Sequence, residues 1–112
     1  MKARIYVAGP YTKGDVAVNV RVAIEAADQL ADAGHYPFVP HLTHFWHLVS
    51  PRPYEFWCDL DNQFLPFCHA VLRIPGESAG ADKEVALAES LGIPVFRTAI
   101  DVVMHFSGRA PN

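Results

Sequence analysis

The chain has 112 residues, of which 51% are hydrophobic and 19% are charged. This composition is typical of one globular domain and excludes a disordered chain. The formal net charge is −3 and the 9 basic residues form no run, which excludes the charge pattern of a protein that binds duplex nucleic acid. The first apolar run is far too short for a signal peptide or a membrane span, and Cys58 and Cys68 form no disulfide or metal pattern. We therefore expect a cytoplasmic protein with reduced thiols and no membrane partner.

The first predicted strand and helix flank a loop of a kind that binds ligands. Residues 4–8 are β-branched and aromatic, which predicts a strand. Gly9 and Pro10 begin the next loop, which has neither a GxGxxG pattern nor a P-loop pattern. Apolar residues then recur at helical spacing between Asp15, a good N-cap, and Gly34, a good residue after the last turn. In α/β folds the loop after the first strand is a common binding site.

Three histidines at three-residue spacing follow the second predicted strand, Tyr36–Val39. We interpret the segment from residue 41 to residue 51 as a polar loop that lines a pocket, where His41 or His44 offers hydrogen bonds. The alternative is a metal site made by His41, His44 and His47. The spacing is weaker evidence than HExxH, whose ligands are four residues apart with a base between them.

An acid lies on the apolar face of the next predicted helix, which Pro53 opens at its first position. Trp57, Asp61 and Leu65 recur at helical spacing. A carboxylate on an apolar face needs either a partner or a chemical task. Asp61 is therefore either a capping or salt-bridged acid, or a functional acid.

The third predicted strand spans residues 70–74 and a Gly/Ser loop follows it. Two more acids, Asp82 and Glu84, lie beyond this loop. We expect a helix from Glu84 to Leu91, with Asp82 and Glu84 in its first turn. The simple interpretation is that both acids complement the helix dipole. The functional interpretation is that they line a ligand site, because such loops lie at the carboxyl edge of a parallel sheet. A carboxylate there can attack an anomeric carbon while a second acid protonates the leaving group.

The last predicted elements are a strand over residues 93–96 and a helix over residues 99–106, followed by a frayed tail over residues 107–112. Strands alternate with helices throughout. This order predicts one α/β domain over residues 1–112, with a doubly wound parallel sheet of four to five strands, Rossmann-like or flavodoxin-like.

Several motifs together resemble the nucleoside 2-deoxyribosyltransferase superfamily, which includes 2′-deoxynucleoside 5′-phosphate N-hydrolases and CMP N-glycosidases. The motifs are Ile5-Tyr6-Val7-Ala8-Gly9-Pro10-Tyr11, Asp61-x-x-x-Leu65, Ser78-x-Gly80-x-x-x-Glu84 and Ala88-x-x-x-Gly92-Ile93-Pro94-Val95. A closer resemblance is to the deoxyribosyltransferase-like domains of the DUF4406 type, and it rests on His41-Leu42-Thr43-His44-Phe45, Trp57, residues 68–73 and Gly76-Glu77-Ser78.

The resemblance implies roles for particular residues. Glu84 matches the glutamate that attacks C1′ and releases the base, and Asp61 matches the acid that works at the leaving base or fixes the sugar. Tyr6 or Tyr11 would hold the glutamate. The residues expected to bind substrate are Gly9, Pro10, Ser78, Gly80, Asp82, His41, His44 and Trp57. Of these, Ser78 and Gly80 match a loop that contacts a 5′-phosphate in the hydrolases.

The sequence departs from the hydrolase pattern next to the glutamate. The hydrolases have Gly-x-Glu, whereas this chain has Asp82-Lys83-Glu84. The extra carboxylate would repel a phosphate unless Lys83 or Arg73 compensates its charge. The presence of a 5′-phosphate, and the choice between hydrolysis and sugar transfer, therefore stay open.

The sequence thus predicts an enzyme that cleaves the N-glycosidic bond of a nucleoside or nucleoside 5′-monophosphate without a cofactor or metal. One alternative is a non-catalytic module that binds and senses a nucleotide. A second alternative is a metal-dependent enzyme that uses His41, His44 and His47. The resemblance also implies a homo-oligomer, a dimer or larger, in which a neighbouring subunit completes each site.

Overall fold

The computed structural model describes residues 1–108, and within them four parallel strands form one sheet in the order β2-β1-β3-β4. The strands are β1 (Arg4–Ala8), β2 (Tyr36–Phe38), β3 (Ala70–Arg73) and β4 (Val95–Phe96). The α-helices are α1 (Val16–Asp32), α2 (Thr43–Val49), α3 (Tyr54–Phe64), α4 (Ala79–Ser90) and α5 (Ala99–Phe106), and the 3₁₀ turns are η1 (Pro40–Leu42) and η2 (Leu65–Phe67). None of these described helices is long and apolar enough to cross a membrane.

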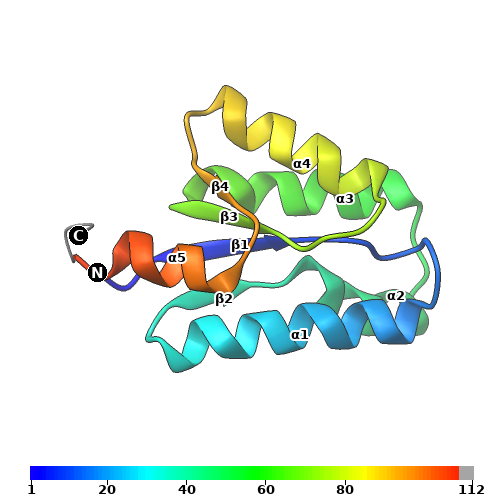
Figure 1. The fold of residues 1–112 in the computed structure, drawn as a ribbon. Helices are drawn as coiled ribbons and strands as arrows, with labels where there is room; N and C mark the ends of the chain where they lie inside the picture. Colours follow the sequence, from blue (N-terminus) through cyan, green and yellow to red (C-terminus); the bar gives the residue numbers. More distant parts are fainter. Residues whose placement is uncertain (109–112) are drawn as a thin grey trace.

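The sheet is covered on both faces: α1 and α5 lie on one side, and α3 and α4 lie on the other (Figure 1). Side chains of β1 alternate between these two layers, as a strand requires. Ile5 and Val7 belong to the cluster that includes Leu30 and Val102, whereas Tyr6 belongs to the cluster around Leu65 and Ala81. The alternation therefore places the phenol of Tyr6 on the side of α4.

The predicted fold class is confirmed, because the sheet is doubly wound and wholly parallel. The bounds of β1 and α5 are those predicted, and α1 begins and ends as expected. Asp15 caps α1 by accepting a hydrogen bond from the Val18 backbone N–H at 3.1 Å, and Gly34 follows the helix with a φ of 91°. The predicted tail over residues 107–112 lies largely outside the described residues.

Two predictions of local structure are wrong. The segment after β2 is not a loop: Pro40 opens η1, the Thr43 hydroxyl donates to the Pro40 carbonyl at 2.8 Å, and α2 follows. The helix α4 begins five residues earlier than expected, because Ser78 caps it by accepting from the Ala81 backbone N–H at 3.1 Å. Glu84 consequently lies in the second turn of α4, not in the first. A smaller difference is that Pro53 is the N-cap of α3, not its first residue.

Candidate functional site

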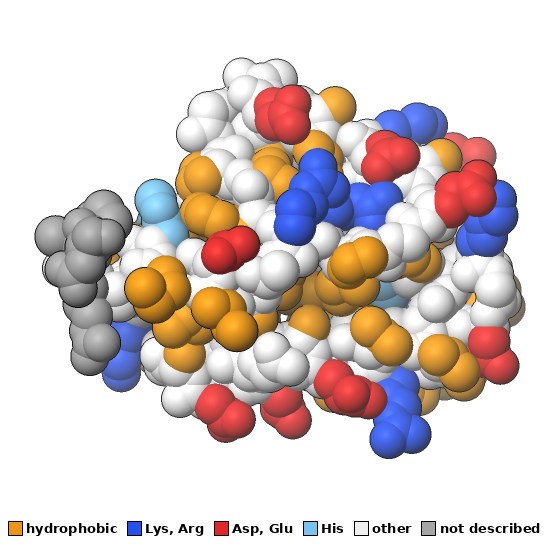
Figure 2. Space-filling model, viewed as in Figure 1, with side chains coloured by type: hydrophobic (Ala, Val, Ile, Leu, Met, Phe, Trp, Pro, Cys, Tyr) orange, Lys and Arg blue, Asp and Glu red, His pale blue; other side chains and the backbone are white. Residues whose placement is uncertain are grey.

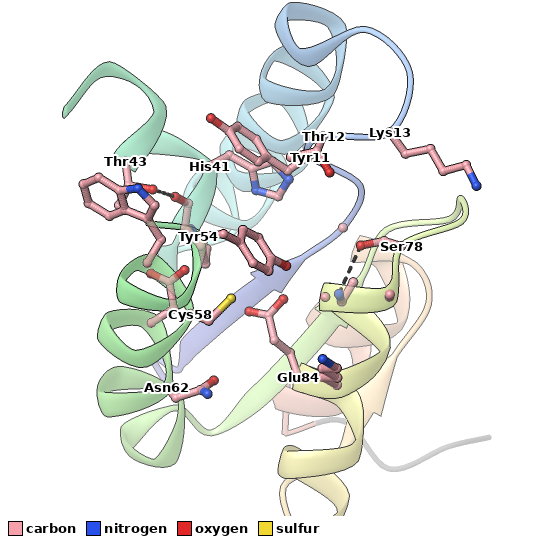
Figure 3. Close-up of a pocket in the computed structure, with 18 of the residues that line it drawn as sticks. Tyr11, Thr12, Lys13, His41, Thr43, Tyr54, Cys58, Asn62, Ser78 and Glu84 are labelled. Carbon is pink, nitrogen blue, oxygen red and sulfur yellow. Dashed lines mark hydrogen bonds between the residues drawn. The ribbon is translucent and has the colours of Figure 1, made fainter. Parts of the chain in front are cut away.

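A cavity of about 1060 Å³ opens at the carboxyl ends of β1 and β3. The chain leaves β1 toward β2 on one side and later returns to β3 on the other side, so this is the point where the strand order reverses. Open α/β sheets bind ligands at such a point. The loop after β1, the start of α4 and one face of α3 surround the cavity (Figure 3).

The structure brings most of the predicted site residues to this cavity. Those that line it are Gly9, Tyr11, His41, Trp57, Asp61, Ser78, Gly80 and Glu84. Four others do not line it: Tyr6 lies beneath Glu84, Pro10 and His44 contact lining residues, and Asp82 faces away. Their roles in binding or catalysis stay predictions.

Glu84 is the carboxyl group that α4 places in the cavity. In Figure 3 its side chain points into the space between α3 and α4, toward Tyr54 and Cys58. Burial raises the pKa of Glu84 to about 8. The fully buried Tyr6 donates its phenolic O–H to Oε2 of Glu84. Of the two tyrosines expected to hold this glutamate, Tyr6 is therefore the one in contact with it.

Asp61 is a second cavity carboxyl, on α3. Burial raises its pKa to about 7. Its Oδ1 is buried and has no hydrogen-bond partner among residues 1–108, and the described ion pairs do not include it. The interpretation of Asp61 as a salt-bridged acid is therefore not supported. Two carboxyl groups with raised pKa values in one cavity are a feature of sites that perform acid–base chemistry.

Tyr11 and His41 shape the wall formed by the loop after β1. The Tyr11 hydroxyl lies 2.6 Å from Nδ1 of His44. Burial raises the pKa of Tyr11. Nε2 of His41 lies 2.9 Å from the Pro10 carbonyl oxygen, which can only accept, so Nε2 carries the proton. Burial lowers the pKa of His41, so this ring favours its neutral form. These contacts tie the loop after β1 to η1 and α2.

The three histidines do not converge on a metal site. His41 bonds Pro10, His44 bonds Tyr11, and His47 accepts from the indole of Trp57 at 2.9 Å. Within residues 1–108, no group of three or more His, Cys, Asp or Glu side chains is placed to hold a metal ion. No observation therefore favours the metal-dependent alternative.

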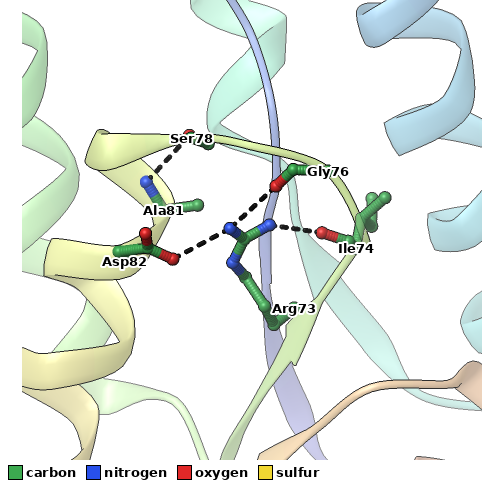
Figure 4. A network of polar contacts seen from close by, with 6 residues as sticks. All are labelled: Arg73, Ile74, Gly76, Ser78, Ala81 and Asp82. Atoms are coloured by element: carbon green, nitrogen blue, oxygen red, sulfur yellow. Dashed lines mark hydrogen bonds and ion pairs between the residues drawn. The ribbon is translucent and has the colours of Figure 1, made fainter.

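A buried arginine organises the loop between β3 and α4 (Figure 4). Arg73, only 5% exposed, donates through Nη1 to the Ile74 carbonyl, and through Nη2 to the Gly76 carbonyl at 3.0 Å and to Oδ1 of Asp82 at 2.9 Å. The extra carboxylate of the sequence motif is thus paired with Arg73 outside the cavity. Gly76 has a φ of 123°, and a Cβ there would lie 2.7 Å from Cγ of Pro10. This loop consequently packs closely against the loop after β1.

An exposed ion pair also joins these two loops. Nζ of Lys13 lies 2.7 Å from Oε1 of Glu77. Both side chains are well exposed, so the pair contributes little to stability. Both residues line the cavity, and the pair therefore places one cation and one anion at its edge.

One face of α3 supplies three cavity residues that the sequence analysis missed: Tyr54, Cys58 and Asn62. They are four residues apart, and this spacing on a helix could have identified them together with Asp61. Two main effects raise the pKa of Tyr54: the larger is a hydrogen bond with the Cys58 side chain, and the second is burial. The Tyr54 hydroxyl approaches α4 so closely that a Cβ at Gly80 would lie 2.6 Å from it. A larger residue at Gly80 would therefore require the Tyr54 hydroxyl to move.

The chain belongs to the family described as domain of unknown function (DUF7768), whose model matches residues 3–98. This corrects the closer resemblance to the DUF4406 type. No curated protein matches the chain. Among solved structures, the chain is similar to a 2-deoxyribosyltransferase from the psychrotolerant bacterium Bacillus psychrosaccharolyticus, with a TM-score of 0.61 and 23% identity over 83% of this chain and 69% of that chain. This likeness shows a shared fold.

Proposed function

We propose that the chain cleaves the N-glycosidic bond of a nucleoside or nucleoside 5′-monophosphate, with Glu84 as the nucleophile. The observation that carries this proposal is the partly buried carboxyl of Glu84, held by Tyr6 in a cavity that also contains Asp61. Its position at the strand-order reversal, and the fold shared with a 2-deoxyribosyltransferase, support a nucleoside-sized ligand.

The proposed reaction has two steps. A carboxylate oxygen of Glu84 bonds to C1′ of the sugar while the C1′–N bond breaks. The electron pair of the C1′–N bond leaves with the base. Asp61 supplies the proton that neutralises the departing base. Water or a second base then attacks C1′ and gives up a proton to the ionised Asp61. The bond between Glu84 and C1′ breaks with its electron pair on the carboxylate, which completes either hydrolysis or sugar transfer.

The two acids must hold opposite protonation states for this chemistry. Glu84 must be ionised, and its pKa of about 8 makes ionisation increase with pH. Asp61 must be protonated, and its pKa of about 7 makes protonation decrease with pH. At pH 7.5 these values leave roughly one molecule in twenty in the reactive state. Tyr6 supports that state by donating to the ionised Glu84.

A second candidate function is a nucleotide-binding module without turnover. The observation that favours it is the same pKa of about 8, since a mostly neutral Glu84 at pH 7 is a poor nucleophile. Such a module would bind its ligand as tightly after Glu84→Gln, because the substitution keeps the shape of a neutral carboxyl group.

A base-release assay separates the two functions. Wild type and Glu84→Gln are incubated with ribonucleosides, deoxyribonucleosides and their 5′-monophosphates, with and without an acceptor base. Glu89→Gln is the matched control, because Glu89 lies exposed on the same helix and outside the cavity. Free base from wild type and Glu89→Gln, but not from Glu84→Gln, supports the glycosidic reaction. Binding without free base in any variant supports the module, and free base from Glu84→Gln excludes Glu84 as nucleophile.

We also propose that the chain acts as a homo-oligomer. The helix α2 has no buried residue, and its region exposes Leu42, Phe45, Trp46, Leu48 and Val49. We call these five residues the α2 surface. Two other residues of α2, Thr43 and His47, line the cavity. A second copy seated on the α2 surface would therefore lie next to the cavity, in line with the expected completion of each site by a neighbour. Figure 2 shows other apolar side chains over α1 and α5.

The α2 surface can be tested by the mass of the protein in solution. We expect light scattering to give a dimer or a larger assembly for wild type. Leu48→Glu with Val49→Glu should give a monomer, whereas Ile100→Glu, an equally exposed apolar position on α5, should leave the assembly intact. A wild-type monomer would contradict the proposal.

A further inference from the structure

His47 has an unusual set of hydrogen bonds at the end of the cavity formed by α2 and α3. Its Nδ1 accepts from the indole N–H of Trp57 at 2.9 Å and from the backbone N–H of Arg52 at 3.2 Å. Neither of these groups can act as an acceptor. Nδ1 therefore carries a lone pair, and the proton of the neutral ring lies on Nε2.

The ring is also fixed in its orientation. Trp57 is 9% exposed, and its ring meets that of His47 edge to face at 5.8 Å. Trp46 and Phe56 pack edge to face on Trp57 at 4.9 Å and 5.1 Å. The Arg52 guanidinium lies 4.6 Å from the centre of the Phe56 ring. The packed aromatic cluster around Trp57 thus fixes the orientation of the His47 ring.

The Nε2–H of His47 has no partner among the described residues, although the side chain lines the cavity. Because Trp57 and Arg52 occupy Nδ1, the ring can only donate from its other nitrogen. Asp61, one turn beyond Trp57 on α3, is a second cavity group that carries a proton below about pH 7. His47 and the protonated Asp61 therefore offer donors to the cavity, which the acids Glu55 and Asp59 also line, and these two donors suit a ligand edge that presents acceptors.

We propose that His47 determines base specificity, by donating Nε2–H to a carbonyl oxygen of the base that leaves. The proposal rests on the proposed function. The preferred base presents an acceptor to His47 at the position where a competing base presents an amino group. A base with N–H at that point would face a donor with a donor, and both would lose their hydrogen bonds to water.

The competing explanation is that His47 only ties α2 to α3, and two substitutions separate these roles. In His47→Asn the amide oxygen takes the position of Nδ1, so it keeps the bonds from Trp57 and Arg52 but loses the donor. In His47→Gln the amide nitrogen takes the position of Nε2, so it keeps a donor but loses the acceptor. His47→Ala loses both, and serves as the reference for purely structural damage.

The readout is the binding of free bases that differ by one carbonyl-to-amino change, uracil against cytosine and hypoxanthine against adenine. We expect wild type to prefer the carbonyl member of at least one pair by about tenfold. We expect His47→Asn to keep the wild-type melting temperature and lose the preference, and His47→Gln to melt lower and keep it. An unchanged preference in His47→Asn, or no preference in wild type, overturns the proposal.

A spectroscopic measurement tests the tautomer independently of any reaction. Nitrogen NMR of ring-labelled protein should show the His47 proton on Nε2, and a proton on Nδ1 overturns the proposal. Failure of the proposed function has a different signature: nucleosides then release no base, while free bases still bind with the dependence on His47 described above.

Discussion

Tyr6→Phe is the substitution that examines the glutamate most closely, because it removes one hydroxyl and keeps the packing of a fully buried ring. The phenol donates to Oε2 of Glu84, and a hydrogen bond to a charged group contributes about 1.5–3 kcal/mol. Its loss disfavours the ionised form. We therefore expect the pKa of Glu84 to rise from about 8 by roughly one to two further units.

This shift predicts a loss of activity that depends on pH. At pH 7 a pKa of about 8 leaves about a tenth of Glu84 ionised, and Tyr6→Phe should lower kcat/KM there roughly ten- to a hundredfold. The defect should shrink as the pH rises toward 9, since Glu84 then ionises in both proteins.

The assay is base release from the preferred substrate over pH 6 to 9, with Tyr36→Phe as control. Tyr36 is 59% exposed on β2 and does not line the cavity, so the loss of its hydroxyl should leave the rate of base release unchanged at every pH. A Tyr6→Phe protein with the wild-type pH profile would refute the assignment of Tyr6 as the group that holds Glu84. So would a loss that is the same at every pH.

Three further predictions concern the same residues. Burial raises the folded-state pKa of Glu84 above its unfolded value, so the free energy of unfolding should fall as pH rises from about 5 to 8, by up to about 1.4 kcal/mol per pH unit. Chemical denaturation at several pH values should show this fall, and the fall should be smaller in Glu84→Gln. Gly80→Ala should not lower the melting temperature, because alanine favours helices and the Tyr54 hydroxyl that its Cβ would meet is the end of a flexible side chain, on a residue that is 53% exposed. Asp82→Asn should cost at most about 1 kcal/mol of stability in chemical denaturation, because the side chain of Asp82 is 71% exposed and the amide oxygen of asparagine can still accept from Arg73.

The sequence predicted the fold well because the evidence for it is local. Strand β1 is a β-branched and aromatic run that ends at Gly9, and α1 carries apolar residues at helical spacing between Asp15 and Gly34. The alternation of such elements is enough to predict a parallel sheet. The carboxyl edge of that sheet then indicates where a ligand site lies, and Glu84 and Asp61 both line the cavity found there.

The remaining features depend on tertiary contacts that no local pattern encodes. Tyr6 and Tyr11 were equivalent in the sequence analysis, and only the packing of β1 against α4 places Tyr6 under Glu84 while Tyr11 turns to His44. Glycine disfavours a helix interior, so Gly80 hid the true start of α4, although Ser78 is a good N-cap. The helix α2 was missed because it buries no residue, and its apolar residues therefore follow no amphipathic pattern.

The most direct test of the central proposal is to trap the sugar on Glu84. A nucleoside with fluorine at C2′ disfavours the oxocarbenium-like transition state and slows the release of the sugar. Incubation with wild type, followed by acid quench and peptide mass spectrometry, should show the mass of the fluorosugar on the peptide that contains Glu84, and no adduct in Glu84→Gln. Base release with the adduct on another residue, or with no adduct at all, would contradict the proposal that Glu84 is the nucleophile.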